Sequence, residues 1–470
     1  MHEDLSNFLI NYLQNKGASY TECRFQEIHS NHFIIKNGVL QLSSFNDEIG
    51  IGIRYIIKNT MGFFSTTELK KDRIRELLDN SIKLTTTASR INEKITLTNE
   101  KIYKKKYNVL QKIKFSNVPT EEKIAFLLDI NKDILKSKVN LQGSYLSFTD
   151  DVTKQIYINS EGTKIISEIP RANLFHVLTI DVNNKSSQRM WESGGCGGYE
   201  IIKSWDLLKK LPEEAKNLQL VLKNGAKPKK GKQDLVVSPE ITGIMVHESA
   251  GHPTEADRIF GREAAQAGES FIEKNSIGQR IGSKAVTIVD DPTIKNSSGF
   301  YLYDDEGVKA RRKYLYKNGI ITEFLHNRET ASYMNIKSNG SSRASSYDRE
   351  PIVRMSNTFV LPSKTPEHQL IEEVKKGIYL KSYTEWNIDD KRMNQRYVGA
   401  EAYEIKNGKI GKPVIHPIIE ITTPKLWSSV LLVADNIEYH HGSCGKGEPL
   451  AAIPVWFGGP SMLIKNVNIY

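Results

Sequence analysis

Long stretches of this chain alternate apolar and polar residues, and this alternation restricts them to half-buried β-strands. Residues 19–66, "SYTECRFQEIHSNHFIIKNGVLQLSSFNDEIGIGIRYIIKNTMGFFST", are punctuated by Asn-Gly and Gly, which predicts a run of antiparallel strands. Residues 141–169 repeat the pattern, with turns expected at 149–151 and 161–162. A chain with this patterning must build at least one large sheet in its first half.

Helical patterns interrupt the strands of the first half and are sparse in the second. Residues 1–17, 66–89 and 119–138 have helical periodicity, and the last of these opens with acids and closes with lysines. Beyond the basic loop at 227–232 the chain is mostly strand-like, for example "KYLYKNGIITEFL" and "KPVIHPIIEITT". We therefore predict an α+β fold, with an N-terminal α+β domain at 1–225 and a β-rich C-terminal domain at 226–470.

Composition argues against membrane insertion and a nucleic-acid surface. No run of 18 apolar residues occurs, and the first 17 residues lack the basic segment followed by an apolar segment that is typical of a signal peptide. The formal net charge is +10, but the lysines are dispersed, which favours a solvated basic surface over a binding face for nucleic acid. The three cysteines, Cys23, Cys196 and Cys444, are too few for a disulfide scaffold and fit a reducing cytoplasm.

The segment "MVHESAGHPTEADRI" carries the pattern of a metal site with unusual spacing. His247, Glu248 and His252 spell H-E-x-x-x-H, one residue longer than the zinc-peptidase motif. Five residues apart, two histidines differ by about 140° around a regular helix, but an extra residue held as a π-type bulge would bring them together. Gly251 offers a permissive backbone, and Pro253 disfavours helical geometry at His252 and predicts that the helix bends or ends there.

Two histidines do not complete a catalytic zinc site, which normally has three protein ligands and a water molecule. Glu255 and Asp257 are close in sequence, and Cys444 in "EYHHGSCGKGEP" is a distant candidate with glycines that would let the backbone turn around it. Cys196 is a further candidate ligand, and His440 and His441 are candidates for a ligand or for binding a substrate carbonyl. The residues alone leave this choice open.

The chain resembles the TldD/PmbA family of zinc metallopeptidases, and within it the TldD branch. The resemblance lies in "GIGIRYIIKNTMGFFST", "GGCGGYE", "VVSPEITGIMVHESAGHPTEAD", "VTIVDDPT", "PIVRMSNTFV" and the terminal "GSCGKGEP". It implies that His247, His252 and Cys444 bind zinc and that Glu248 is catalytic. It also implies a dimer, either of this chain or with a TldE/PmbA-like chain, that encloses a chamber for unfolded peptides.

One segment departs from the family pattern. A glycine-rich stretch is usual after "GIY", whereas this chain continues "LKSYTEWNIDDKRMNQRYVG" after Tyr379. The departure bears on substrate binding and on the pairing of chains in a dimer, and it leaves the metal motif intact.

These residues predict a zinc-dependent peptidase for short or unfolded peptides. Zinc would activate a water molecule, Glu248 would act as general base, and Glu255 or Asp257 would hydrogen-bond a ligand histidine. The alternative is a regulatory or binding protein with structural zinc, such as a modulator of DNA gyrase. That alternative requires a fourth protein ligand, for example Glu255 or His441.

Overall fold

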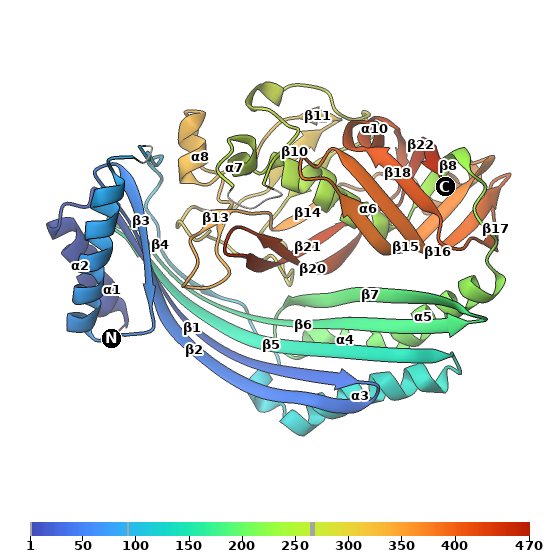
Figure 1. Ribbon diagram of the computed structural model, residues 1–470, viewed down its shortest axis with the longest axis horizontal. Coiled ribbons are helices and arrows are strands. Elements are labelled where there is room, and N and C mark those ends of the chain that lie inside the picture. The colour runs from blue at the N-terminus through green and yellow to red at the C-terminus, as the bar shows by residue number, and fades with distance from the viewer. Residues whose placement is uncertain (1, 92–93, 264–267) are drawn as a thin grey trace.

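The computed structural model describes residues 2–91, 94–263 and 268–470. The first half of the chain builds one long, curved sheet, and the second half builds two large sheets and a two-stranded one, which lie on its concave side (Figure 1). The predicted α+β class is confirmed, and the second half is rich in strands.

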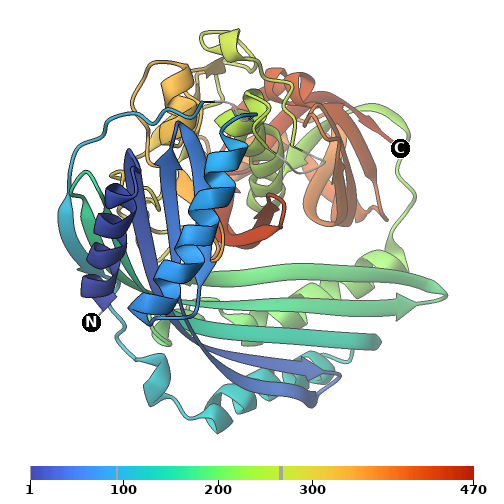
Figure 2. The same ribbon diagram turned by 60° about the vertical axis from the view of Figure 1, so that its left-hand side comes forward.

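The curved sheet has the strand order β3-β2-β1-β5-β6-β4, and β7 also pairs with β6. Only β4 runs parallel to its neighbour; the other pairs are antiparallel. Turned by 60°, the sheet is seen to bend around the second half (Figure 2). Its strands are β1 (Tyr20–Lys36), β2 (Val39–Ile57), β3 (Thr60–Thr66), β4 (Lys104–Asn108), β5 (Leu141–Asn159), β6 (Lys164–Val182) and β7 (Lys185–Cys196).

One of the two turns expected in 141–169 is wrong. Strand β5 runs straight through 149–151, because the acids there find partners inside the fold. The Asp150 carboxylate accepts hydrogen bonds from the buried Lys123 Nζ and from Asn31 Nδ2, both at 2.8 Å. The turn at 161–162 is confirmed: β5 ends before it and Gly162 has a φ of 101°.

Two pairs of helices cover the convex side of this sheet at its two ends (Figure 1). Helices α1 (His2–Asn15) and α2 (Lys71–Ala88) share one apolar core with β1 and β2, while α3 (Thr120–Lys136) and α5 (Leu207–Asn224) share another with β5 and β6. The helices expected at 1–17, 66–89 and 119–138 are therefore confirmed, with the second beginning a few residues later than expected. No helix of the described residues is both long and apolar enough to cross a membrane.

The second half contains a six-stranded sheet and a closed ring of strands. The six-stranded order is β11-β10-β9-β14-β21-β20. In the other sheet, β15-β8-β22-β18-β16 is closed by a further pairing of β15 with β16. The strands of the two are β8 (Gly231–Val237), β9 (Ile288–Asp290), β10 (Lys313–Lys317), β11 (Ile320–Ile321), β14 (Asn357–Val360), β15 (Lys376–Ile388), β16 (Asn394–Lys406), β17 (Lys409–Pro413), β18 (Ile418–Thr422), β19 (Val430–Val433), β20 (Glu438–Lys446), β21 (Ala451–Gly459) and β22 (Met462–Ile469).

Helix α6 (Pro239–Val246) lies between these two sheets and contacts strands of both. Seven of its eight residues are buried, which explains why its sequence is apolar on all sides rather than amphipathic. The remaining short elements are α4 (Glu200–Lys203), α7 (Ala256–Ile259), α8 (Arg328–Tyr333), α9 (Glu367–Glu372), α10 (Thr423–Ser428), β12 (Ser342–Arg343) and β13 (Ile352–Val353).

Buried charges join the two halves. Arg54 on β2 contacts Glu22 at 2.8 Å and, from the second half, Glu306 at 2.5 Å, and all three side chains are at most 5% exposed. The expected loop at 227–232 is shorter, because β8 begins at Gly231. Each sheet draws its strands from one side of residue 226, and for this reason we propose 1–225 and 226–470 as the two domains.

Candidate metal centre

The H-E-x-x-x-H motif begins at the end of α6. The Ser238 hydroxyl caps the helix by accepting the Ile241 N–H, and Pro239 occupies its first turn. From His247 to Gly251 the backbone widens into a π-helix, and from His252 to Thr254 it tightens into a 3₁₀ turn. The bulge expected from the spacing is thus present, and it absorbs the extra residue of the motif.

The roles expected for Gly251 and Pro253 need correction. Gly251 has ordinary helical angles (φ −63°, ψ −68°), and so does His252 (φ −56°, ψ −44°). Glycine is needed at 251 for space, because a Cβ there would lie 1.9 Å from Met355 Sδ. The helical path ends after Thr254, since Glu255 is extended.

Cys444 approaches the motif from the six-stranded sheet. It lies in β20 opposite Ile453 of β21, so the expected glycine turn around it is wrong. The neighbouring glycine serves packing instead: a Cβ at Gly442 would lie 2.6 Å from the ring of Phe457. The turn itself comes later, at Gly447, which has a φ of 90°.

His247, His252 and Cys444 come together in the structure. One potential ligand atom from each lies within 4.8 Å of those of the other two, and all three residues are buried. Cys444 Sγ is 3.4 Å from His252 Nε2, and the two imidazole rings meet edge to face with centroids 4.8 Å apart. The family resemblance implied that these three residues share one site, and the fold brings them together from segments almost 200 residues apart.

The donor set and its surroundings fit a zinc ion. Two imidazoles and a thiolate are ligands that zinc accepts, and three of them leave a fourth position open. Burial alone would raise the pKa of the Cys444 thiol, but His252, His247 and Arg354 together hold that pKa well below its usual range. The buried Nδ1 of His247 has no hydrogen-bond partner among the described residues, so no such bond ties this ring down.

Glu255 supports the second histidine. Its fully buried Oε2 lies 2.8 Å from His252 Nδ1, 2.7 Å from Arg258 Nε and 3.3 Å from Lys446 Nζ. Burial raises the pKa of Glu255, but Lys446, His252 and Arg258 lower it well below the ordinary value. A carboxylate on Nδ1 leaves Nε2 directed at Cys444, which is the nitrogen a shared ion would use.

Asp257, the other acid considered for this support, has a different partner. Its Oδ1 lies 2.7 Å from Lys446 Nζ, and the described residues show no contact between it and a histidine of the motif. Lys446 comes two residues after Cys444 on the same strand and is completely buried. It therefore ties β20 to the acids that follow the motif.

Glu248 points to a hairpin of the strand ring. Its Oε2 lies 2.7 Å from Nη1 of Arg392, and the two side chains are 9% and 12% exposed. Arg392 belongs to the segment that departs from the family pattern after Tyr379. Arg392 was not identified as a candidate residue from the sequence. The departure from the family pattern was the one signal that pointed to the segment in which it lies.

The other candidates lie outside the ligand cluster. His441 Nδ1 is 2.6 Å from the Ser298 hydroxyl, and His440 packs edge to face on Trp191. Burial first, and nearby arginines second, lower the pKa of both imidazoles to about 3. Cys196 is buried in a separate apolar cluster, and Cys23 is in the core of the first sheet.

Two cavities lie near the second half. One, of about 1070 Å³, separates β7 and α5 from the start of α6 and from β20, and it is lined by Trp191, Glu192, Glu240 and His440, among others. The ring of Phe457 lies between it and the metal cluster, with centroids 6.3 Å from His440 and 5.6 Å from His247. None of the three candidate ligands lines this cavity, and neither does Glu248, so the Phe457 ring separates it from the motif.

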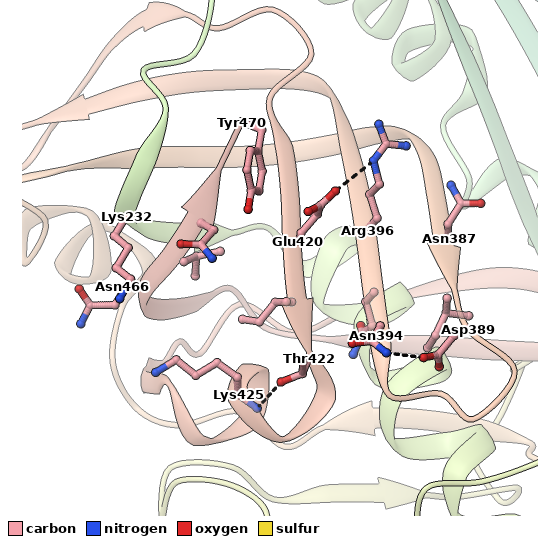
Figure 3. A pocket seen from close by; sticks show the side chains of 15 residues that line it. Lys232, Asn387, Asp389, Asn394, Arg396, Glu420, Thr422, Lys425, Asn466 and Tyr470 are labelled. Carbon is pink, nitrogen blue, oxygen red and sulfur yellow. Dashed lines mark hydrogen bonds and ion pairs between the residues drawn. The ribbon is translucent and has the colours of Figure 1, made fainter.

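The other cavity, of about 940 Å³, lies over β16, β18 and β22 (Figure 3). Its walls carry an ion pair of Arg396 with Glu420, a hydrogen bond from Asn394 to Asp389, and the side chain of Tyr470. None of the three candidate ligands lines it, and neither does Glu248. The first cavity lacks these residues as well, but the Phe457 ring connects its wall residue His440 to His247, and for this reason we assign the chemistry of the motif to the side of the first cavity.

Comparisons with known proteins agree along most of the chain. Residues 21–85, 113–223 and 230–470 match the models of domain 1, the central domain and the C-terminal domain of the PmbA/TldA metallopeptidases. A metalloprotease of Methanocaldococcus jannaschii is 31% identical over 94% of this chain and 95% of its own. A zinc metalloprotease TldD homolog of Saccharolobus solfataricus is 25% identical over 96% of this chain and 97% of its own.

Solved structures share the fold at low identity. TldE of Thermococcus kodakarensis superposes with a TM-score of 0.76 over 99% of both chains at 15% identity. A Thermotoga maritima protein provisionally named a modulator of a DNA gyrase gives a TM-score of 0.79 over 100% of both chains at 18% identity.

Proposed function

Because this chain belongs to the PmbA/TldD metallopeptidase family, we propose that it is a zinc-dependent peptidase whose ligands are His247, His252 and Cys444. The observation that carries the proposal is the convergence of these three buried residues, with Glu248 next to the first ligand and outside the cluster. Three protein ligands are the number that catalytic zinc sites use, since the fourth position is then open for water or substrate.

The proposed reaction divides between the ion and the chain. A bound zinc ion would supply Lewis acidity, polarising a peptide carbonyl and making a water molecule more acidic. Glu248 would take the proton of the attacking water and deliver it to the leaving amine. Glu255 would keep His252 in one tautomer and one orientation through the 2.8 Å contact with Nδ1.

The cavity of about 1070 Å³ supports a peptide rather than a folded substrate. It lies between the curved sheet and the second half, so a compact domain could not enter without separating them. An extended chain would pass Phe457 to reach Glu248. Its backbone could add to strands at the cavity wall, which gives binding without strong side-chain selection.

The proposal is tested by separating metal binding from turnover. Glu248→Gln should retain the full zinc content by metal analysis and lose about 10²- to 10⁴-fold in peptide hydrolysis, since the base is removed and the ligands remain. Glu385→Gln, on a side chain that is 52% exposed, is the matched control and should cleave like the parent. Equal hydrolysis by Glu248→Gln and the parent would remove Glu248 from the mechanism.

The alternative of a structural zinc requires a fourth protein ligand. The two side chains considered for it have other partners: His441 binds Ser298, and Glu255 binds His252, Arg258 and Lys446. This arrangement favours the peptidase over a regulatory protein. A zinc-saturated parent that hydrolyses no peptide would reverse the preference.

We further propose that the protein is cytoplasmic and acts as a dimer, with itself or with a TldE-like chain. The likeness to TldE supports a shared fold for such a partner. The reduced cysteines, all three buried and free, support a reducing compartment.

A further inference from the structure

Arg392 is held in place by a firmly anchored turn. It lies between β15 and β16 and has a φ of 63°, a left-handed conformation that is costly for a residue with a side chain. The Thr423 hydroxyl donates to the Arg392 carbonyl at 2.6 Å, and the Phe271 N–H donates to the Lys391 carbonyl at 2.9 Å. The turn is thus fixed from two sides, and its geometry sends the Arg392 side chain inward.

The guanidinium of Arg392 uses few of its donors. Nη1 contacts Glu248 at 2.7 Å, while the buried Nε–H has no acceptor in the part of the chain that the structure describes. A guanidinium has five N–H donors in a fixed plane, suited to a carboxylate that binds through both oxygens. A buried donor without a partner is costly, so this position is suited to an acceptor that comes from outside the chain.

The other buried cations around the metal cluster already have partners. Lys446 Nζ donates to Asp257 and to the Val353 carbonyl, and Arg354 donates to the carbonyls of Ala451 and Cys444. The Nε–H of Arg354 also lacks an acceptor among the described residues, but Arg354 is completely buried, whereas the Arg392 side chain is 12% exposed. Arg392 differs from both, because its described contact is a single carboxylate oxygen of the candidate base. It is the described cation of this region best able to take an anionic group of a substrate.

We propose that Arg392 is the receptor for the free C-terminal carboxylate of a peptide substrate and thereby directs cleavage to the end of the peptide. This inference rests on the proposed peptidase function. The place of Arg392 suits cleavage at the C-terminus of a peptide. A carboxylate bound to Arg392 lies next to Glu248, so the peptide bond on which Glu248 acts is the one before the last residue. The incoming carboxylate and Glu248 share the guanidinium, so substrate binding loosens the hold of Arg392 on the base.

The first test compares two blocked tripeptides that differ only in a free C-terminal carboxylate or a carboxamide. The zinc-loaded parent should cleave the last peptide bond of the acid with a kcat/KM about 10- to 100-fold higher than for the amide, the range of one charge-assisted contact. Arg392→Met should bring this ratio close to one, and Arg392→Lys should keep part of it. A ratio of one in the parent, or an unchanged ratio in Arg392→Met, would overturn the proposal.

The matched control is Arg396→Met. Arg396 lies on the same hairpin, is 39% exposed and pairs with Glu385 and Glu420. Its replacement should leave the ratio of acid to amide as in the parent. The same loss of preference in Arg396→Met would show that the hairpin as a whole, and not the Arg392 guanidinium, sets it.

The second test does not depend on turnover. Acetyl-dialanine and its carboxamide are titrated into the zinc-loaded parent and the Glu248→Gln and Arg392→Met variants. The acid should bind more tightly to Glu248→Gln than to the parent, because the competing carboxylate is gone, and the amide should not. Arg392→Met should lose the preference for the acid.

These measurements keep the two proposals apart. Carboxylate binding through the metal alone would survive in Arg392→Met and would refute the receptor role. A parent that binds the acid through Arg392 but cleaves neither tripeptide would contradict the peptidase function and leave the receptor role supported.

Discussion

Replacing Glu255 with glutamine tests how the second histidine is held. The substitution keeps the size of the side chain and an oxygen that can accept from His252 Nδ1. It removes the negative charge that lies within 3.3 Å of His252, Arg258 and Lys446. The imidazole becomes a weaker donor to a metal ion, because the carboxylate that raises its basicity is lost.

The expected loss is moderate. Partners of a ligand histidine are worth about 10- to 100-fold in metal affinity, which is about 1.4–2.7 kcal/mol. Cys444→Ala, which removes a proposed ligand outright, should cost clearly more. Asp257→Asn is the matched control, since Asp257 is closer to Lys446 than Glu255 is (2.7 Å against 3.3 Å) but does not contact His252 in the described residues, and it should change the affinity by less than about threefold.

Zinc affinity is measured by competition with a chromophoric chelator, and the unfolding of the metal-free variants by denaturant is measured alongside. The second measurement is needed because Glu255→Gln also weakens a buried charge cluster, which destabilises the fold. Equal losses of affinity in Glu255→Gln and Asp257→Asn would refute the role of the His252 contact. A loss in Glu255→Gln as large as in Cys444→Ala would make Glu255 a ligand.

Two further outcomes are expected. Burial raises the pKa of Glu192 to about 7, whereas its ordinary value is 4.5. Between these two pH values the native state keeps a proton that the unfolded state releases. The ionisable Glu192 therefore lowers the stability of the fold as the pH rises from about 4.5 to about 7. Glu192→Gln should therefore be more stable than the parent at pH 8, by up to about 3 kcal/mol, and equally stable at pH 4; denaturant unfolding at both values measures this, and no gain at pH 8 would contradict it. Light scattering should show a dimer, whose interface we expect to bury more than roughly 2,000 Å². The protein should digest a denatured protein and spare the native form of the same protein. A monomer that cleaves both forms equally fast would contradict this prediction.

Local signals in the sequence predicted what depends on neighbours along the chain. The spacing of His247 and His252 predicted the π-helix, and the alternation of polarity predicted the strands. Cys196 and Cys444 both stand among glycines, so composition could not rank them; the family resemblance did, and the pairing of β20 with β21 places only Cys444 at the motif.

What the sequence could not predict depends on contacts between distant segments. The acids at 149–151 resemble a turn until Lys123 is known to lie against them. Gly251 resembles a flexible point until Met355 is seen to fill the space beside it. Arg392 gave no local sign of meeting Glu248, because a hairpin 144 residues away along the chain delivers it.

Strand β20 is joined to the motif by two buried links, Cys444 to His252 and Lys446 to Glu255 and Asp257. Replacing either segment with one that lacks these charged partners would leave an uncompensated buried charge, which typically costs 3–5 kcal/mol. Chimaeric enzymes from this family should therefore fold when the motif and the final strands come from the same parent, and the crossover points belong outside both.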